Sequence, residues 1–105
     1  RKMKTILCIK KQVEEEFKDA ENYICCATHY KADYPELADT YQKLSAEEYG
    51  HASELYACMV GIIEDYKKTK SPSECMLEMW NEFKEDYIQE AAHIKMMQDI
   101  YKMTK

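Results

Sequence analysis

Apolar residues recur every three or four positions in three long stretches of the chain, and this spacing predicts three amphipathic helices. The stripes consist of Ile6, Val13, Phe17, Ala20, Ile24 and Ala27; of Leu37, Tyr41, Leu44, Leu55, Met59, Ile62 and Tyr66; and of Met76, Trp80, Phe83, Tyr87, Ile94, Met97 and Tyr101. We interpret the stripes as the faces that form the hydrophobic core.

Two short segments, each with a proline, separate the stripes. Pro35 follows Asp33 and Tyr34, and Pro72 follows Ser71. Proline suits the first turn of a helix, and serine suits the position just before it. The pattern therefore predicts helices over about residues 4–31, 35–68 and 72–103. Short connections make neighbouring helices antiparallel, so we expect an all-α, up-down-up bundle forming one domain over residues 1–105.

Acidic and imidazole side chains interrupt these apolar faces. At about 100° per residue, Glu48 falls in the middle of the second face, with His51 one turn on. Glu16 lies beside the first stripe, Glu90 lies within the third, and His93 lies near the edge of the third. A lone carboxylate in a helical core is unfavourable unless it is paired or neutralised. Three inward acids, one from each helix, therefore indicate a shared partner.

The depth of these residues in the bundle is predicted to be the same. Measured from the connection near Asp33, between the first and second predicted helices, Glu16 lies about 25 Å along its helix and Glu48 about 22 Å. Measured from the connection near Lys70, between the second and third predicted helices, Glu48 lies about 33 Å away and Glu90 about 30 Å. One layer would then hold Glu16, Glu48, His51, Glu90 and His93, which matches the inward Glu and Glu-x-x-His pattern of di-iron and di-manganese bundles.

A structural reading of the same residues stays open. Glu48 and His51 would then form a buried hydrogen-bonded pair with Tyr41 or Tyr23, and His93 would be an exposed edge residue. Asp86, one turn before Glu90, is a reserve ligand.

Charge and cysteine content narrow the class of protein. The net charge of -5 argues against a nucleic-acid surface, because phosphate binding needs clustered Lys and Arg. The apolar run at residues 6–9 is too short for a signal peptide or a membrane span, so we expect a cytoplasmic protein without membrane partners. The five cysteines are odd in number and lack C-x-x-C spacing, which predicts free thiols in a reducing compartment.

Over about residues 13–60 the chain resembles the ferritin-like superfamily, especially rubrerythrin-like and encapsulated-ferritin-like proteins. The resemblance lies in Glu16 with Tyr23 seven residues later, and in the run Glu47-Glu48-Tyr49-Gly50-His51-Ala52. It implies that Glu16, Glu48 and His51 are iron ligands and that Tyr23 hydrogen-bonds near the site. Glu90-Ala91-Ala92-His93 looks like the second Glu-x-x-His of the family.

The chain also departs from the family pattern. Full members have four helices and one more metal-binding Glu, so either a ligand is absent or two protomers pair into a shared bundle, as encapsulated ferritins do. No rubredoxin-like cysteine module is present.

We hypothesise a dinuclear metal centre, with iron first and manganese as the alternative, that oxidises Fe(II) or reduces O2 or peroxide in a homodimer. One alternative is a metal-free helical interaction module of bacterial or phage origin. Another is a scaffold bundle that associates through apolar residues off the main stripes, namely Cys25, Tyr30, Ile63, Ile88 and Met96.

Overall fold

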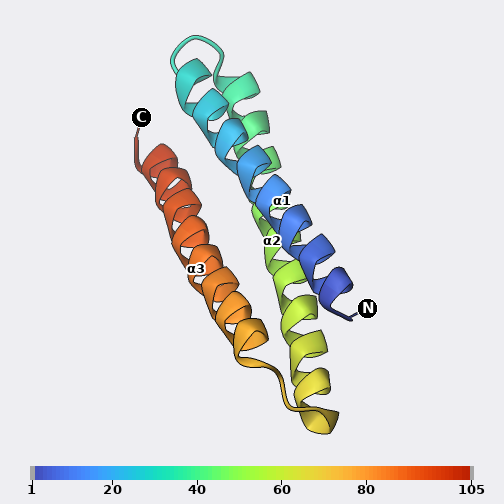
Figure 1. Ribbon diagram of the computed structural model, residues 1–105. Helices are drawn as coiled ribbons and strands as arrows, with labels where there is room; N and C mark the ends of the chain where they lie inside the picture. The colour runs from blue at the N-terminus through green and yellow to red at the C-terminus, as the bar shows by residue number, and fades with distance from the viewer. Residues whose placement is uncertain (1, 105) are drawn as a thin grey trace.

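The computed structural model describes residues 2–104, with side chains from residue 3, and consists of three long helices (Figure 1). These are α1 (Lys2–Tyr30), α2 (Pro35–Thr69) and α3 (Glu74–Met103). The predicted all-α fold is confirmed, and the predicted boundaries agree within two residues. Among the described residues, no helix has an apolar stretch long enough to cross a membrane.

The helix ends follow from local chemistry. Pro35 occupies the first turn of α2, where its missing N–H leaves no hydrogen bond unmade. At the start of α3, the Ser73 Oγ accepts a hydrogen bond from the Met76 N–H at 3.2 Å. This helix therefore begins at Glu74 rather than at the predicted residue 72, because Ser73 and not Ser71 provides the side-chain cap.

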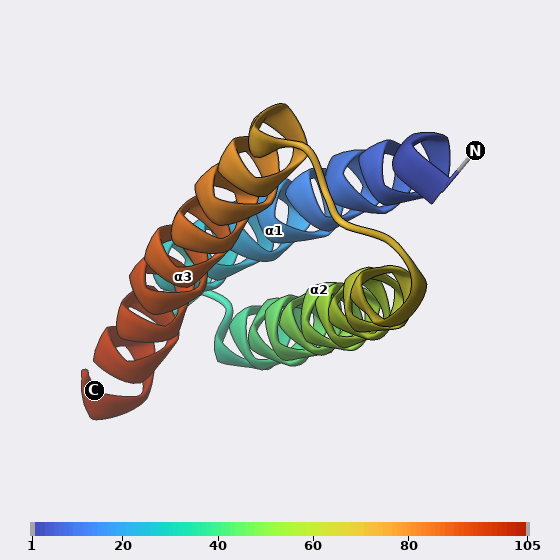
Figure 2. The ribbon, with the colours of Figure 1, turned by 60° about the horizontal axis from the view of Figure 1, so that its bottom comes forward.

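The helices α1 and α2 form a long antiparallel hairpin, and α3 returns along it, packed mainly on α1 (Figure 1 and Figure 2). The result is elongated, with extents of 56 × 18 × 16 Å. Its radius of gyration is 16.6 Å, against about 13 Å for a compact domain of roughly 100 residues. Such a shape leaves much of the helix surface without a partner in the same chain.

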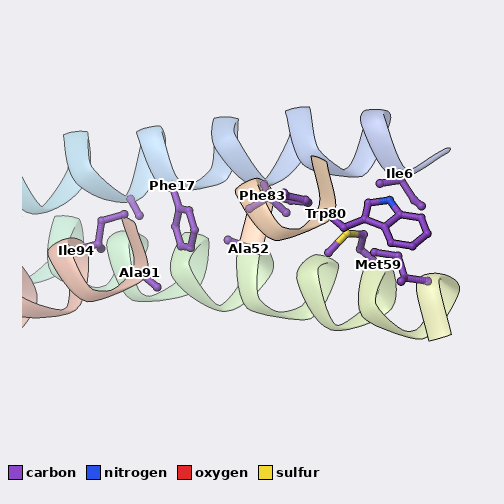
Figure 3. Packing of buried hydrophobic residues seen from close by; sticks show 11 residues of the cluster. Ile6, Phe17, Ala52, Met59, Trp80, Phe83, Ala91 and Ile94 are labelled. Atoms are coloured by element: carbon purple, nitrogen blue, oxygen red, sulfur yellow. The ribbon is translucent and has the colours of Figure 1, made fainter. Parts of the chain in front are cut away.

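The core lies along the seam between the three helices. Figure 3 shows Phe17 of α1, Ala52 and Met59 of α2, and Trp80 and Phe83 of α3 in this seam. Aromatic rings join the helices, since Phe17 lies 5.4 Å from Tyr87 between ring centroids.

Some apolar positions of α2 differ from the predicted core. Ile63, predicted to be exposed, is buried, whereas Leu37, placed in the predicted core, is 41% exposed. The actual centre of the buried face runs through Ser45 and Ala52, because those are the positions that turn toward α1. Leu44 and Leu55, on one side of this buried face, are consequently only half-buried.

Lys31, in the turn between α1 and α2, holds the end of α3 against the hairpin. The Lys31 ammonium donates to the main-chain carbonyls of Tyr101 and Thr104 and lies 4.1 Å from the centre of the Tyr101 ring. A cation at a helix C-terminus is favoured by the helix dipole. The Tyr101 hydroxyl in turn donates to Asp39 Oδ1 at 3.0 Å. These contacts fix the position of α3 along the hairpin.

One buried polar network connects all three helices. The Ser45 hydroxyl of α2 donates to the Ala20 carbonyl of α1 at 2.6 Å, and the Gln98 amide of α3 donates to the Ser45 Oγ at 3.0 Å. Ser45 is fully buried and Gln98 is 3% exposed. Buried polar groups must be paired to be tolerated, so this network selects the register in which they meet.

We expect Ser45→Ala to lower the free energy of unfolding by about 1–3 kcal/mol, because it leaves the Gln98 amide buried without this acceptor. Urea denaturation followed by circular dichroism measures the change. Thr40→Ala is the matched control, since that exposed hydroxyl bonds to the Glu36 carbonyl of its own helix. An equal effect of the two substitutions would show that the network does not stabilise the bundle.

Candidate metal centre

Three of the predicted ligands meet in the groove between α1 and α2. Glu16 of α1 and Glu48 and His51 of α2 each offer one ligand atom, and these atoms all lie within 4.8 Å of one another. The i, i+3 spacing puts Glu48 and His51 on one face of α2. Antiparallel packing with a short turn brings Glu16 to the same height, as the depth argument predicted for these two helices.

The contacts within the group are short and involve one imidazole nitrogen. His51 Nδ1 lies 3.0 Å from Glu48 Oε1 and 3.6 Å from Glu16 Oε2. The side chains of Glu16 and Glu48 are 15% and 20% exposed, whereas that of His51 is 56% exposed. Two largely shielded carboxyl groups therefore lie behind an imidazole that reaches solvent.

The two carboxyl groups shift each other's proton affinity. The interaction with Glu48 is the largest cause that lowers the pKa of Glu16, and the Gln12 amide and His51 act in the same direction against burial. The interaction with Glu16, followed by burial, raises the pKa of Glu48. The pair therefore loses its first proton more readily, and its second less readily, than two separate carboxyl groups would.

The imidazole shows the complementary shift. Partial desolvation lowers the pKa of His51, but the hydrogen bond to Glu48 and the charges of both carboxylates outweigh it, so this pKa lies above its ordinary value of 6.5. The site thus attracts positive charge.

One oxygen of the group remains without an ordinary hydrogen bond. Glu16 Oε1 accepts from the Gln12 amide at 2.9 Å, whereas Glu16 Oε2 is buried and has no hydrogen-bond partner. A proton shared with Glu48 would satisfy this oxygen only in part. A divalent cation would satisfy it fully, and a set of two carboxylates and one imidazole suits iron or manganese.

Glu90 and His93 lie elsewhere. Glu90 is exposed and lines a cavity of about 350 Å³ between α1 and α3, together with Phe17 and Asp86. The Nε2 atom of His93 lies 3.1 Å from Glu21 Oε2. The expectation that Glu90 points into the core is wrong, because Ala91 and Ile94 occupy the buried face of α3 at this height. A ligand role for Glu90 and His93 remains a prediction.

Sequence reasoning missed three residues next to the group. Gln12, one turn before Glu16, fixes the position of that carboxylate. Glu54 and Cys58 line a cavity of about 350 Å³ with Glu16, His51 and Leu55. The signal that finds them is helical spacing, since Gln12 lies four residues from Glu16, and Glu54 and Cys58 lie three and seven residues from His51.

The group lies on the side of the hairpin that α3 does not cover. Glu21, which contacts α3 through His93, is about 140° around α1 from Glu16. On the Glu16 side, the half-buried residues Leu44, Leu55 and Ile62 flank Glu48 along α2. We call this surface the open flank. It is partly apolar and has the three-residue group in its middle.

The shifted proton affinities predict how pH affects the metal-free protein. The folded chain holds the Glu48 proton more tightly than the unfolded chain, so this contribution is full below pH 4.5 and is lost as pH rises through the folded pKa. The contribution of His51 is full below pH 6.5 and is lost as pH rises through the folded pKa of this imidazole. Glu16 acts oppositely, since its contribution is present above 4.5 and is lost at lower pH.

We therefore expect the melting temperature of metal-free protein to fall as pH rises from 4.5 to above 6.5. Thermal unfolding with chelator present measures it. Glu48→Gln should flatten the profile, and an unchanged slope in this variant would contradict the coupled proton affinities described above.

Comparison with known proteins identifies a family. A sequence model of the rubrerythrin family matches residues 8–105, a range that contains Glu16, Glu48 and His51. Neither curated proteins nor solved structures give a significant match.

Proposed function

Because this chain belongs to the rubrerythrin family of ferritin-like, iron-binding proteins, we propose that Glu16, Glu48 and His51 form half of a dinuclear iron centre. The observation that carries the proposal is the convergence of their ligand atoms within 4.8 Å. The Glu16 Oε2 atom supports it further, because a buried carboxylate oxygen without a hydrogen-bond donor is stabilised by a bound cation.

The residues of the chain have distinct roles in this proposal. Bound iron supplies one-electron redox chemistry, and the protein oxidises Fe(II) or reduces O2 or peroxide. The carboxylates of Glu16 and Glu48 supply negative charge that favours the ferric state. Metal binding requires both carboxyl groups to be deprotonated, because only the anionic form acts as a ligand. Gln12 holds Glu16 in place through its 2.9 Å hydrogen bond. Manganese, which also prefers oxygen ligands, is the alternative metal.

A second copy of the chain completes the centre in this proposal. Ferritin-like bundles bind two metal ions with one Glu from each of two helices and one Glu-x-x-His from each of the other two. One protomer offers one Glu on α1 and one Glu-x-x-His on α2, which is half of that set. Twofold pairing across the open flank doubles it to four Glu and two His. The pairing would also bury the half-exposed leucines of this flank.

Iron titration combined with size measurement tests the proposed function. Protein purified without chelator and then stripped of metal should bind about one iron per chain under anaerobic conditions. Exposure to air should then give a near-ultraviolet absorbance rise that saturates at the same stoichiometry. Light scattering after size exclusion should give a dimer mass. Iron uptake no higher than that of an unrelated acidic helical protein would instead favour the metal-free interaction module.

A further inference from the structure

Four tyrosines form a continuous row of rings along the α1–α2 groove. The centroids of Tyr23 and Tyr41 are 6.1 Å apart, those of Tyr41 and Tyr30 are 6.2 Å apart, and those of Tyr30 and Tyr34 are 6.1 Å apart. Tyr41 and Tyr30 are stacked at an interplanar angle of 16°. We call these residues the tyrosine row. It alternates between α1 and α2, so it exists only because the two helices pair in this register.

The row begins about two helical turns from the candidate metal centre. Tyr23 follows Glu16 by seven residues and Tyr41 precedes Glu48 by seven residues. Seven residues are nearly two full helical turns, so each tyrosine lies on the same side of its helix as the acid, about 10 Å along the axis. Both rings therefore lie on the open-flank side of the hairpin.

The row ends at the surface. Tyr23, Tyr41 and Tyr30 are half-buried, whereas Tyr34, in the turn between α1 and α2, is 60% exposed. His29 also contacts the Tyr30 ring, at 4.8 Å between centroids. The ring spacing is thus regular from Tyr23 to Tyr34, and phenol is the side chain at every position.

We propose that the tyrosine row carries oxidising equivalents from the metal centre to the surface at Tyr34. This inference rests on the proposed function, because it needs iron at Glu16, Glu48 and His51. Phenol is readily oxidised by one electron when its proton can leave, and rings about 6 Å apart exchange electrons readily.

The first step balances with hydrogen peroxide as the oxidant. Reduction of one peroxide to two waters takes two electrons and two protons. A bound Fe(II) would supply one of these electrons, and the Tyr23 phenol supplies the other. Tyr23 becomes a phenoxyl radical and releases its proton to water, and two protons are taken up from solvent.

Each later step moves the radical by one ring. The next phenol gives an electron to the phenoxyl radical and loses its proton, while the radical gains one proton and becomes phenol again. At Tyr34 a small one-electron reductant in solvent, such as ascorbate or a thiol, supplies an electron and a proton. The row thereby protects the ligand side chains from one-electron oxidation.

The experiment locates the radical rather than measuring turnover. Protein loaded anaerobically with Fe(II) below one equivalent is mixed with hydrogen peroxide, and freeze-quenched samples are examined by electron paramagnetic resonance. Parallel samples receive a nitroso spin trap, and peptide mapping by mass spectrometry locates the adduct. We expect a tyrosyl radical signal and an adduct on Tyr34.

Two variants with matched chemistry decide the outcome. Tyr41→Phe keeps the ring but removes the phenol, so the adduct on Tyr34 should be lost while a radical on Tyr23 persists. Tyr56→Phe is the control, because Tyr56 stacks on Tyr87 at 3.8 Å in a separate aromatic group, and it should leave the Tyr34 adduct unchanged.

Iron stoichiometry measured in each sample separates the two hypotheses. If wild-type protein binds no iron, the proposed function fails and the row fails with it. If iron binds but no radical forms on these tyrosines, or Tyr41→Phe retains the Tyr34 adduct, then only the row is overturned.

Discussion

Glu48→Gln should weaken iron binding by more than about 100-fold, because even loss of a group that only orients a ligand costs 10- to 100-fold in metal affinity. Glutamine keeps the shape of the side chain but removes the anionic oxygen. It also removes the charge that helps to hold His51, whose Nδ1 lies 3.0 Å from Glu48 Oε1. Anaerobic Fe(II) titration followed by metal analysis after desalting measures the loss.

The matched control is Glu47→Gln. Glu47 is the preceding residue of α2, is exposed, and lies outside the three-residue group, so its substitution removes the same formal charge without touching the site. Iron content in Glu48→Gln equal to that in Glu47→Gln would mean that Glu48 is not a ligand.

The metal-free form of Glu48→Gln should unfold at a temperature equal to or above that of the wild type near neutral pH. The substitution removes one of two adjoining carboxyl groups whose joint ionisation is unfavourable, as the raised pKa of Glu48 indicates. A gain in metal-free stability together with a loss of iron would show that the acid is present for binding rather than for folding.

Phe17→Ala should give the largest loss of stability, about 3–5 kcal/mol, which is typical for removal of a buried aromatic ring. Phe17 is 3% exposed, and its ring centroid lies 5.9 Å from that of Tyr49 and 5.4 Å from that of Tyr87. The ring therefore contacts both α2 and α3 from its place on α1. A loss of this size is a large part of the stability of an ordinary domain, about 5–15 kcal/mol.

Chemical denaturation with circular dichroism measures this loss. Phe17→Leu, which keeps most of the buried volume, should fall clearly between the wild type and Phe17→Ala. Equal effects of the two substitutions, or a loss for alanine below about 1 kcal/mol, would show that the seam between the helices can close around the missing ring.

Local rules of the sequence determined the helices and the height of the site. A period of 3.6 residues identified all three helices, and Pro35 marked the start of α2. The fixed rise per residue placed Glu16 and Glu48 at equal height, because the short turn leaves little freedom of register. The resemblance to rubrerythrin-like proteins, drawn from Glu16 and the Glu-x-x-His of α2, is confirmed by the family match.

Tertiary packing decided how each helix is rotated about its own axis. Periodicity gives the width of a buried face, but its centre is ambiguous where small or polar residues lie on it. Ala91 and Gln98 are buried on α3, so Glu90 turns outward, and Ser45 is buried on α2 where hydropathy predicts no core position. A buried amide and hydroxyl are favourable only once their partners are in place. Those partners belong to other helices, and only the folded arrangement of all three supplies them.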